Sequence, residues 1–342
     1  MAASERVITS TGVRQVSSDR SSALPSAASD DRERIIAHIA PEERGRMLGS
    51  KSFSFKHDLG EHPSLTLPAV RQLVAQMFAE GRFDQIFYKT GKSMASGRYS
   101  DADSTDEILT VLDNFDNAGV WLRLTRVDEV TPQFDELVDR FYAELSELYQ
   151  QDIKARTMRT FLALFVSSPG AYTNYHIDHT WNFLLQISGR KTVHLYDPLD
   201  PDVITQGDKE GWYMRNFTLT PKAQAKAIAY ELGPGDGVHH PVNAPHWVQN
   251  GSEISISLSI GLCLHDSNRD AKIHQTNFVL RRFGLKPKPP GRSKWRDAAK
   301  VSFMSLWSEK SSTSLDKAVF SGATRLRRML NIRSADNSYE PK

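Results

Sequence analysis

Residues 171–182 read Ala-Tyr-Thr-Asn-Tyr-His-Ile-Asp-His-Thr-Trp-Asn, and the prediction of fold and function starts from this segment. His176 and Asp178 stand two positions apart, in a segment bordered by residues typical of β-strands. Side chains on a strand repeat every second residue, so both groups are expected on one face. An imidazole and a carboxylate on one face can bind a divalent metal together, and such a pair needs a third ligand from elsewhere in the chain.

The predicted third ligand is His246. Residues 233–236, Gly-Pro-Gly-Asp, form a tight turn, and the segment from Pro241 to His246 follows it. Two histidines and one carboxylate make the facial triad of non-haem Fe(II) oxygenases, which leaves coordination positions open for substrate chemistry. The alternative for the His-x-Asp pattern alone is a surface strand with two polar groups, because a chain with 11 histidines produces this spacing by chance.

Other polar residues at fixed offsets favour a metal site that takes a dicarboxylate. Lys191 follows the turn at residues 189–190 and is expected on the next strand of a hairpin. Its ammonium group can bind the far end of a dicarboxylate co-substrate. The amide of Asn182 can steady the near carboxylate, which chelates the metal.

This pattern resembles the JmjC and cupin-like family of Fe(II)- and 2-oxoglutarate-dependent dioxygenases. Residues 171–262 are most similar to the branch that contains the asparaginyl hydroxylase of a hypoxia-inducible transcription factor. In that branch the first metal histidine is followed by Asp two on, Asn six on and the oxoglutarate lysine fifteen on, and a threonine precedes it by three. The matching residues of this chain are Thr173, His176, Asp178, Asn182 and Lys191.

The resemblance implies a double-stranded β-helix core and an iron site held by His176, Asp178 and His246. It also implies that Lys191, Thr173 and Asn182 bind 2-oxoglutarate. The chain departs from the branch at one position that is expected beside the co-substrate, where Ser259 replaces a second asparagine. The implied reaction consumes O₂ and 2-oxoglutarate, releases succinate and CO₂, and hydroxylates a C–H of an unidentified protein side chain or small molecule.

Two other function classes would keep the same fold. One is a zinc- or manganese-bearing cupin such as an isomerase, and the other is a non-catalytic interaction module. Neither uses 2-oxoglutarate, so neither gains from Lys191 and Thr173 at their offsets. Since a fold does not by itself decide function, the co-occurrence of these residues with the triad is what favours the oxygenase.

The remaining histidines near the motif are expected to have lesser roles. His179 lies three residues past His176 and should point away from the metal pair on a strand. His194 is expected to pack on the predicted hairpin. Either His239 or His240 is expected to face the pocket, as a support for the ligands or as a contact with substrate.

The composition is that of an ordinary globular protein, with 342 residues, 39% hydrophobic residues, 25% charged residues and a net charge of +2. The single cysteine, Cys263, excludes an intramolecular disulfide and a cysteine-based zinc site. No apolar run approaches the roughly 18–20 residues that span a membrane. The N-terminus is too polar for a secretory signal, so a cytoplasmic location is expected. No clear nucleic-acid motif is present.

Four segments are expected in an α+β protein with a mainly β core. Residues 1–30 are rich in Ser and Ala and should form a disordered tail. Residues 31–155 should form helices and strands packed on the core, 156–264 the double-stranded β-helix (jelly roll), and 265–342 a helical extension. The extension carries 17 Lys or Arg against 7 Asp or Glu. It is expected to be a solvated cap on the core or the interface of a homodimer, with a surface for acidic partners, anionic lipid headgroups or nucleic acid as the alternative.

A two-residue period and an apolar helical stripe predict the individual elements. Helices are expected over 67–79 and after Thr131-Pro132, and Ser104 with Glu107 reads as a capping box. Strands are predicted at 52–55, 119–126, 160–166, 182–188, 191–196, 227–232, 238–242 and 253–262. Two further core strands are expected near 203–218 and 247–250.

Overall fold

The computed structural model describes residues 34–48, 51–90, 100–101, 109–110, 112–113, 119–217, 219–309 and 315–333. The chain divides into residues 1–32 and residues 33–342, and every described residue belongs to the second unit. The predicted tail and the predicted capping box of Ser104 and Glu107 lie outside the described residues. Among the described helices, none has the length and apolar character needed to cross a membrane.

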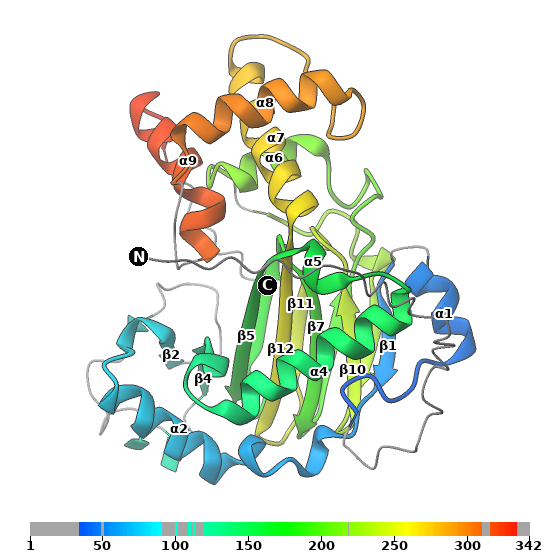
Figure 1. Ribbon diagram of the computed structural model, residues 1–342, viewed down its shortest axis with the longest axis vertical. Helices are drawn as coiled ribbons and strands as arrows, with labels where there is room; N and C mark the ends of the chain where they lie inside the picture. The colour runs from blue at the N-terminus through cyan, green and yellow to red at the C-terminus, as the bar shows by residue number, and fades with distance from the viewer. Residues whose placement is uncertain are drawn as a thin grey trace, which may run out of the picture. The chain divides into compact units, whose positions relative to one another are not determined.

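Two antiparallel sheets form the core (Figure 1). Their strands are β1 (Phe53–Lys56), β2 (Ile86–Thr90), β3 (Ser100–Asp101), β4 (Val120–Thr125), β5 (Thr157–Ser167), β6 (Tyr172–His176), β7 (Trp181–Ser188), β8 (Lys191–Leu195), β9 (Ile228–Leu232), β10 (Asp236–His240), β11 (His246–Asn250) and β12 (Ser255–Leu264). The large sheet has the order β1-β10-β7-β12-β5-β4-β2-β3, and the small sheet has the order β6-β11-β8-β9. Strands β5 to β12 therefore contribute four strands to each sheet, which is the predicted jelly-roll arrangement of a cupin core.

The helices flank this core. They are α1 (Pro41–Leu48), α2 (Leu67–Ala79), α4 (Pro132–Tyr149), α5 (Ile153–Arg156), α6 (Gln206–Tyr213), α7 (His265–Arg282), α8 (Lys294–Trp307) and α9 (Leu315–Met329). Short 3₁₀ turns occur at Leu59–Glu61, Pro63–Leu65, Phe83–Gln85, Val127–Glu129 and Gln224–Lys226. The predicted helix over 67–79 is confirmed, and it begins where the Thr66 side chain accepts a hydrogen bond from the Ala69 amide.

The large sheet has an apolar outer face and a polar inner face. On β12, Ile256, Leu258, Ile260 and Leu262 alternate with Ser255, Ser257 and Ser259. The aliphatic set belongs to the main hydrophobic core together with the buried stripes of α2 and α4, and α4 lies across the strands in Figure 1. Because side chains alternate along the strand, the apolar face of the sheet is covered by helices and the serines point toward the space between the sheets.

Two features of the predicted core are wrong. Residues 203–218 contain helix α6 instead of a strand, and this helix begins at a capping box made by Thr205 and Asp208. The missing core strand is β6, which ends at the metal-binding motif. The turn at residues 189–190 does not close a hairpin, because β7 belongs to the large sheet and β8 to the small sheet. Gly189 makes this crossing with φ +70°, and a Cβ there would meet the Ile254 carbonyl oxygen.

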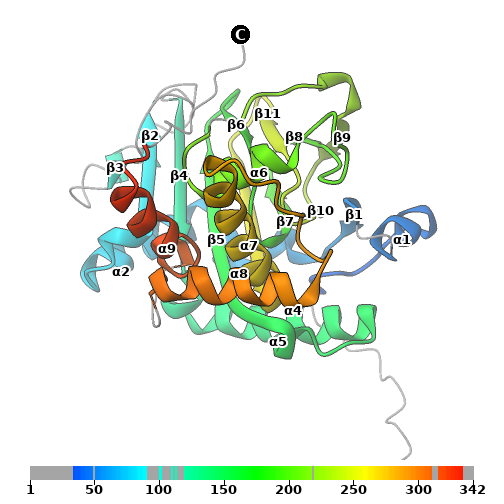
Figure 2. The same ribbon diagram turned by 90° about the horizontal axis from the view of Figure 1, so that it is seen from above.

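Helices α7, α8 and α9 gather beside α6 at one end of the sheets in Figure 1, and they lie in front of the sheets in Figure 2, which is seen from above. Glu210 of α6 is buried and accepts hydrogen bonds from Arg281 of α7, at 2.6 Å and 3.2 Å. Gln275 of α7 donates to the Val319 carbonyl of α9 at 2.8 Å. The described part of the predicted C-terminal extension is therefore helical and is joined through buried polar contacts to α6.

Candidate metal centre and cavity

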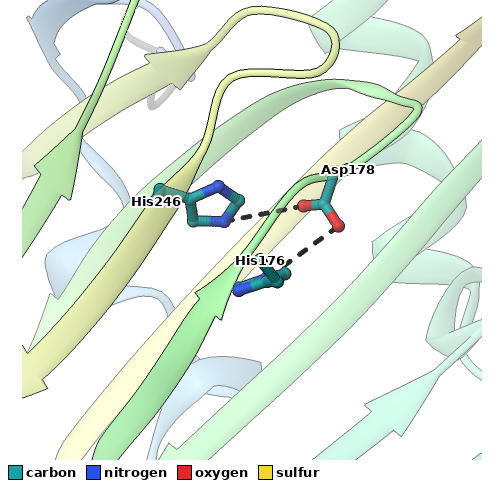
Figure 3. Close-up of side chains that lie close together, drawn as sticks. All are labelled: His176, Asp178 and His246. Carbon is teal, nitrogen blue, oxygen red and sulfur yellow. Dashed lines mark ion pairs between the residues drawn. The ribbon is translucent and has the colours of Figure 1, made fainter. Parts of the chain in front are cut away.

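Three predicted ligands meet at the paired ends of β6 and β11. His176 lies directly opposite His246 in this antiparallel pair, and their ring centroids are 4.1 Å apart. Opposite residues on neighbouring strands project from the same face, and a register shift after His246 locally bends the pair. Asp178 faces both rings (Figure 3), with carboxylate oxygens 3.9 Å from His176 Nε2 and 3.8 Å from His246 Nε2. Ligand atoms of the three residues lie within 4.8 Å of one another, so they could hold one metal ion.

The loop that carries Asp178 is held by the loop that precedes His246. Strand β6 ends at His176, so Asp178 does not share a strand face with it as predicted. The Asp178 carbonyl instead accepts a hydrogen bond from the Asn243 amide at 2.8 Å. Asn243 has the left-handed backbone conformation, with φ +63°, which asparagine tolerates better than most residues. This link between the two loops fixes the carboxylate relative to both histidines.

Backbone carbonyls set the tautomer of both histidines. His176 Nδ1 lies 2.6 Å from the Asn174 carbonyl oxygen, and His246 Nδ1 lies 2.9 Å from the Ala244 carbonyl oxygen. A carbonyl oxygen can only accept, so each Nδ1 carries the proton and each Nε2 presents its lone pair. Metal-binding histidines are typically oriented in this way.

The electrostatics of the site favour the metal-binding forms of these groups. Burial lowers the pKa of His246, which is 3% exposed, to about 4, and the neighbouring His176 adds to this shift. Burial alone would raise the pKa of Asp178, but His176 and His246 more than offset this, and the net shift is downward. A neutral imidazole and an ionised carboxylate at neutral pH are the forms that bind a divalent cation. Two imidazoles and one carboxylate suit iron, manganese, cobalt or zinc.

A cavity of about 860 Å³ adjoins the three ligands, and this volume is in the range of small-molecule sites. It brings together every site residue predicted from the sequence. These are Thr173, His176, Asp178, Asn182, Lys191, His246 and Ser259.

Lys191 is a buried cation in the wall of this cavity. It is 6% exposed, and no hydrogen bond or ion pair joins its ammonium group to another described residue. Burial lowers the pKa of Lys191 to about 7. A buried ammonium without a partner is costly, and an anion bound beside it would lower this cost. Lys191 lies opposite Asn250, at the end of β11 away from His246. The spacing of residues along a strand therefore places the backbone of Lys191 ~13 Å from that of His246 in the strand direction.

Ser259 supports Asn182 from the neighbouring strand. Its hydroxyl donates to Asn182 Oδ1 at 2.8 Å, so the Asn182 NH₂ group is left to face the cavity. Gly261 lies directly opposite Asn182 in the β12–β7 pair, and a Cβ there would come within 3.6 Å of Asn182 Oδ1. The serine that departs from the asparaginyl-hydroxylase pattern therefore orients the amide that remains.

The other histidines differ partly from expectation. His240 lines the cavity, whereas His239 packs among aromatic rings and contacts the Asn182 carbonyl through Nδ1 at 2.9 Å. His194 stacks on Trp247, with centroids 3.9 Å apart. The expectation that His179 points away from the site is wrong, because the strand ends before it and it lines the same cavity.

Several cavity residues were missed by the sequence-based prediction. Asn250 continues the two-residue period from His246 through Val248, so alternation along β11 could have found it. Arg215 and Phe320 come from the segment after α6 and from α9, and the Arg215 guanidinium lies 4.5 Å from the centre of the Phe320 ring. No local pattern links these two residues, which stand more than 100 positions apart.

The match to a family model agrees with this architecture. The family model described as a cupin-like domain matches residues 69–260. No match to a curated protein sequence is found.

Solved structures similar to the chain include the ribosomal oxygenase YcfD of Escherichia coli, with 16% identity, a TM-score of 0.46, and coverage of 80% of this chain and 68% of that chain. The same protein in complex with cobalt and 2-oxoglutarate has 15% identity, a TM-score of 0.43, and coverage of 80% and 67%. The DMSP lyase DddQ of Ruegeria pomeroyi has 14% identity, a TM-score of 0.21, and coverage of 31% and 39%. Similarities of this strength do not decide a reaction.

Proposed function

The chain belongs to the cupin-like domain family, and we propose that it is an oxygenase that depends on Fe(II) and 2-oxoglutarate. The observation that carries the proposal is Lys191, a buried ammonium without a partner among the described residues. It lines the same cavity as the His176, Asp178 and His246 ligand set. A short dicarboxylate that chelates a metal at one end would bring its other carboxylate to this lysine.

Each residue of the cavity has a role in this proposal. His176, Asp178 and His246 would hold the iron, which together with 2-oxoglutarate supplies the oxidative chemistry when bound. Lys191 binds the far carboxylate through a charge-assisted hydrogen bond, and Thr173 lies on the same cavity wall. The NH₂ group of Asn182 donates to the near carboxylate, with Ser259 fixing its orientation.

The competing functions account for fewer of these features. A zinc or manganese cupin that acts as an isomerase would use the same three ligands but would leave Lys191 buried without an anion. An interaction module without a co-substrate would bear the same cost. Both alternatives would be more stable with an apolar residue at position 191, because the desolvation cost of the ammonium group would disappear.

In this proposal the hydroxylated C–H belongs to a protein side chain or to a small molecule. The proposal also includes kinship with the asparaginyl-hydroxylase branch.

The cavity wall offers two guanidinium groups that lie over aromatic rings. Arg123 lies 4.5 Å from the centre of the Phe87 ring, and Arg215 lies at the same distance from Phe320. These flat, cationic surfaces are where the substrate would enter beside the metal ligands.

A second copy of the chain is the proposed macromolecular partner, through α8. Trp295 and Leu306 are 71% and 81% exposed on one face of this helix, together with Phe303. In an antiparallel pair of α8 helices centred between residues 300 and 301, Trp295 would face the partner's Leu306, and Phe303 would face the partner's Ala298. This face is self-complementary, as an isologous interface requires. Sedimentation of the wild type should show a dimer that Leu306→Glu dissociates, and a wild type that stays monomeric would contradict the pairing.

Titration of the anaerobic Fe(II) protein with 2-oxoglutarate tests the proposed function. Chelation of iron by the keto acid gives a charge-transfer absorption in the visible range. We expect this band to appear and saturate, whereas glutarate, which lacks the keto group, should give none. A fully iron-loaded protein that shows no band and no binding would favour a metal cupin that does not use 2-oxoglutarate.

A further inference from the structure

His240 is a buried histidine whose hydrogen bonds are missing. It is the last residue of β10, is 3% exposed, and neither of its ring nitrogens has a hydrogen-bond partner among the described residues. Buried polar groups in native proteins are nearly always paired, and an unpaired one usually indicates a ligand or a function. An apolar side chain of similar size would fill this space without leaving two polar atoms unsatisfied.

The position of His240 connects it to the proposed metal centre. Its ring packs edge-to-face against His246, with centroids 4.6 Å apart and an interplanar angle of 69°. It lies directly opposite Asn182 in the β10–β7 pair, and both residues line the cavity. His240 is therefore next to a proposed metal ligand and next to the amide proposed to hold the near carboxylate.

The neighbouring histidine gives a contrast on the same strand. Side chains alternate along β10, so His239 points to the opposite face from His240. The His239 ring lies among Phe53, Phe183 and Trp181, and its Nδ1 contacts a backbone carbonyl. His239 Nε2 also has no partner among the described residues, but His239 packs among these rings, whereas His240 is one of the residues that line the cavity.

We propose that His240 binds the metal-chelating end of the co-substrate, by donating a ring N–H to a carboxylate or keto oxygen of the keto acid. The inference deepens the proposed function and rests on it. Lys191 and His240 then divide the recognition between them: Lys191 binds the far carboxylate, and His240 together with Asn182 binds the chelating end. The assignment rests on the position of the His240 ring and on its missing hydrogen-bond partners. It does not depend on the protonation state, because the neutral and the charged imidazole both carry an N–H.

Pyruvate distinguishes the two ends, because it has the keto-acid end and lacks the far carboxylate. The experiment measures the affinity of the anaerobic Fe(II) protein for 2-oxoglutarate and for pyruvate, together with iron affinity and melting temperature. His240→Phe keeps an aromatic ring and removes both nitrogens. We expect it to weaken both ligands by about tenfold or more, the effect of losing one hydrogen bond to a charged group, with iron affinity and melting temperature unchanged or higher.

Two matched variants complete the design. His240→Gln restores an N–H donor and should recover most of the affinity for both ligands. Lys191→Met should weaken 2-oxoglutarate strongly and leave pyruvate binding as it is in the wild type.

Unchanged affinity for both ligands in His240→Phe would overturn the inference and make His240 a packing residue. Loss of iron in that variant would also overturn it, because His240 would then act by positioning His246. If the phenylalanine variant fails to fold, the same measurements on His240→Leu and His240→Gln decide between these outcomes. Failure of the wild type to bind either keto acid when loaded with iron would count against the proposed function itself.

Discussion

Two groups of polar side chains lie between the two sheets, one on the large sheet and one drawn from both sheets, and they differ in whether the hydrogen bonds of their buried atoms are complete. At one end, Gln186 is fully buried and donates to the Ser188 and Gly189 carbonyls and to the Ser255 hydroxyl, at 2.6 Å, 3.1 Å and 3.0 Å. Its own carbonyl oxygen accepts from the Ser257 hydroxyl at 2.7 Å. We call this set the Gln186 cluster.

The second group lines the cavity beside the proposed metal ligands. His240 has two unpaired ring nitrogens, Asn174 and Asn250 each have an unpaired side-chain oxygen, and Lys191 has no partner among the described residues. The Gln186 cluster is satisfied by the protein and so contributes to stability alone. The cavity group has no such partners among the described residues, which is the pattern expected of polar groups that bind a ligand.

The largest effect is expected from the metal ligands. His176→Ala, Asp178→Ala and His246→Ala should each abolish iron binding while the protein stays folded, because each removes one of the three donors found in the described part of the chain. The measurement is the iron content of anaerobically reconstituted protein. His194→Ala is the matched control, since His194 lies on the same sheet and stacks on Trp247, outside the ligand set. Full iron occupancy in any of the three variants would remove that residue from the site.

Lys191→Ala comes next and should affect the co-substrate and not the metal. Removing one partner of a buried charge pair costs on the order of 3–5 kcal/mol, which corresponds to a loss of affinity for 2-oxoglutarate of about 150-fold to several thousand-fold. Titration of the charge-transfer band measures the midpoint, and iron content should equal that of the wild type. Lys209→Met is a suitable control, because Lys209 is also buried but donates to the Pro198 carbonyl. An unchanged midpoint in Lys191→Ala would show that this lysine has no part in binding.

The Gln186 cluster should respond in the opposite way. Gln186→Leu leaves two hydroxyls and two carbonyls without this partner, so we expect the protein to lose about 3 kcal/mol of stability. Its affinity for 2-oxoglutarate, once the protein is folded and loaded with iron, should equal that of the wild type. Chemical denaturation and the band titration on the same samples check both parts. If Gln186→Leu is as stable as the wild type, the claim that the Gln186 cluster stabilises the fold while the cavity group serves binding is wrong.

The smallest effect is a pH dependence. Because the free Lys191 has a pKa of about 7 and a bound carboxylate would raise it, the complex holds a proton that the free protein loses above neutral pH. Affinity for 2-oxoglutarate should therefore fall by about tenfold for each pH unit above 7, until the pH reaches the pKa of the complex. Calorimetry at pH 8 in buffers with different ionisation enthalpies should show proton uptake. Lys191→Met should show neither effect, and a flat profile in the wild type would contradict the assignment.

The sequence predicts those parts of the fold that depend on local periodicity. Alternation identified most of the core strands, and the apolar stripe of α2 was placed correctly. The segment of β6 was expected to be extended, through Asp178, but it was not counted among the core strands, because Tyr-Thr-Asn-Tyr-His alternates poorly between apolar and polar residues. Period alone also cannot say to which sheet a strand belongs, so the hairpin predicted at residues 189–190 was wrong.

In the candidate site, too, the residues that share a local sequence pattern were predicted, and those brought together only by folding were not. Fixed offsets in one segment brought Thr173, His176, Asp178, Asn182 and Lys191 to attention, and all five line one cavity. Their chemical roles remain a prediction. Phe320 and Arg215 had no such signal, because α9 and the segment after α6 meet only in the folded chain.

Succinate formation tests the central claim most directly. Purified protein with Fe(II), ascorbate, O₂ and 2-oxoglutarate should form succinate slowly even without its substrate, and His176→Ala should form none. Lys191→Ala should approach the wild-type rate only at far higher 2-oxoglutarate concentration. A protein fully loaded with iron that neither binds 2-oxoglutarate nor forms succinate would contradict the account and leave a metal-binding cupin without this co-substrate.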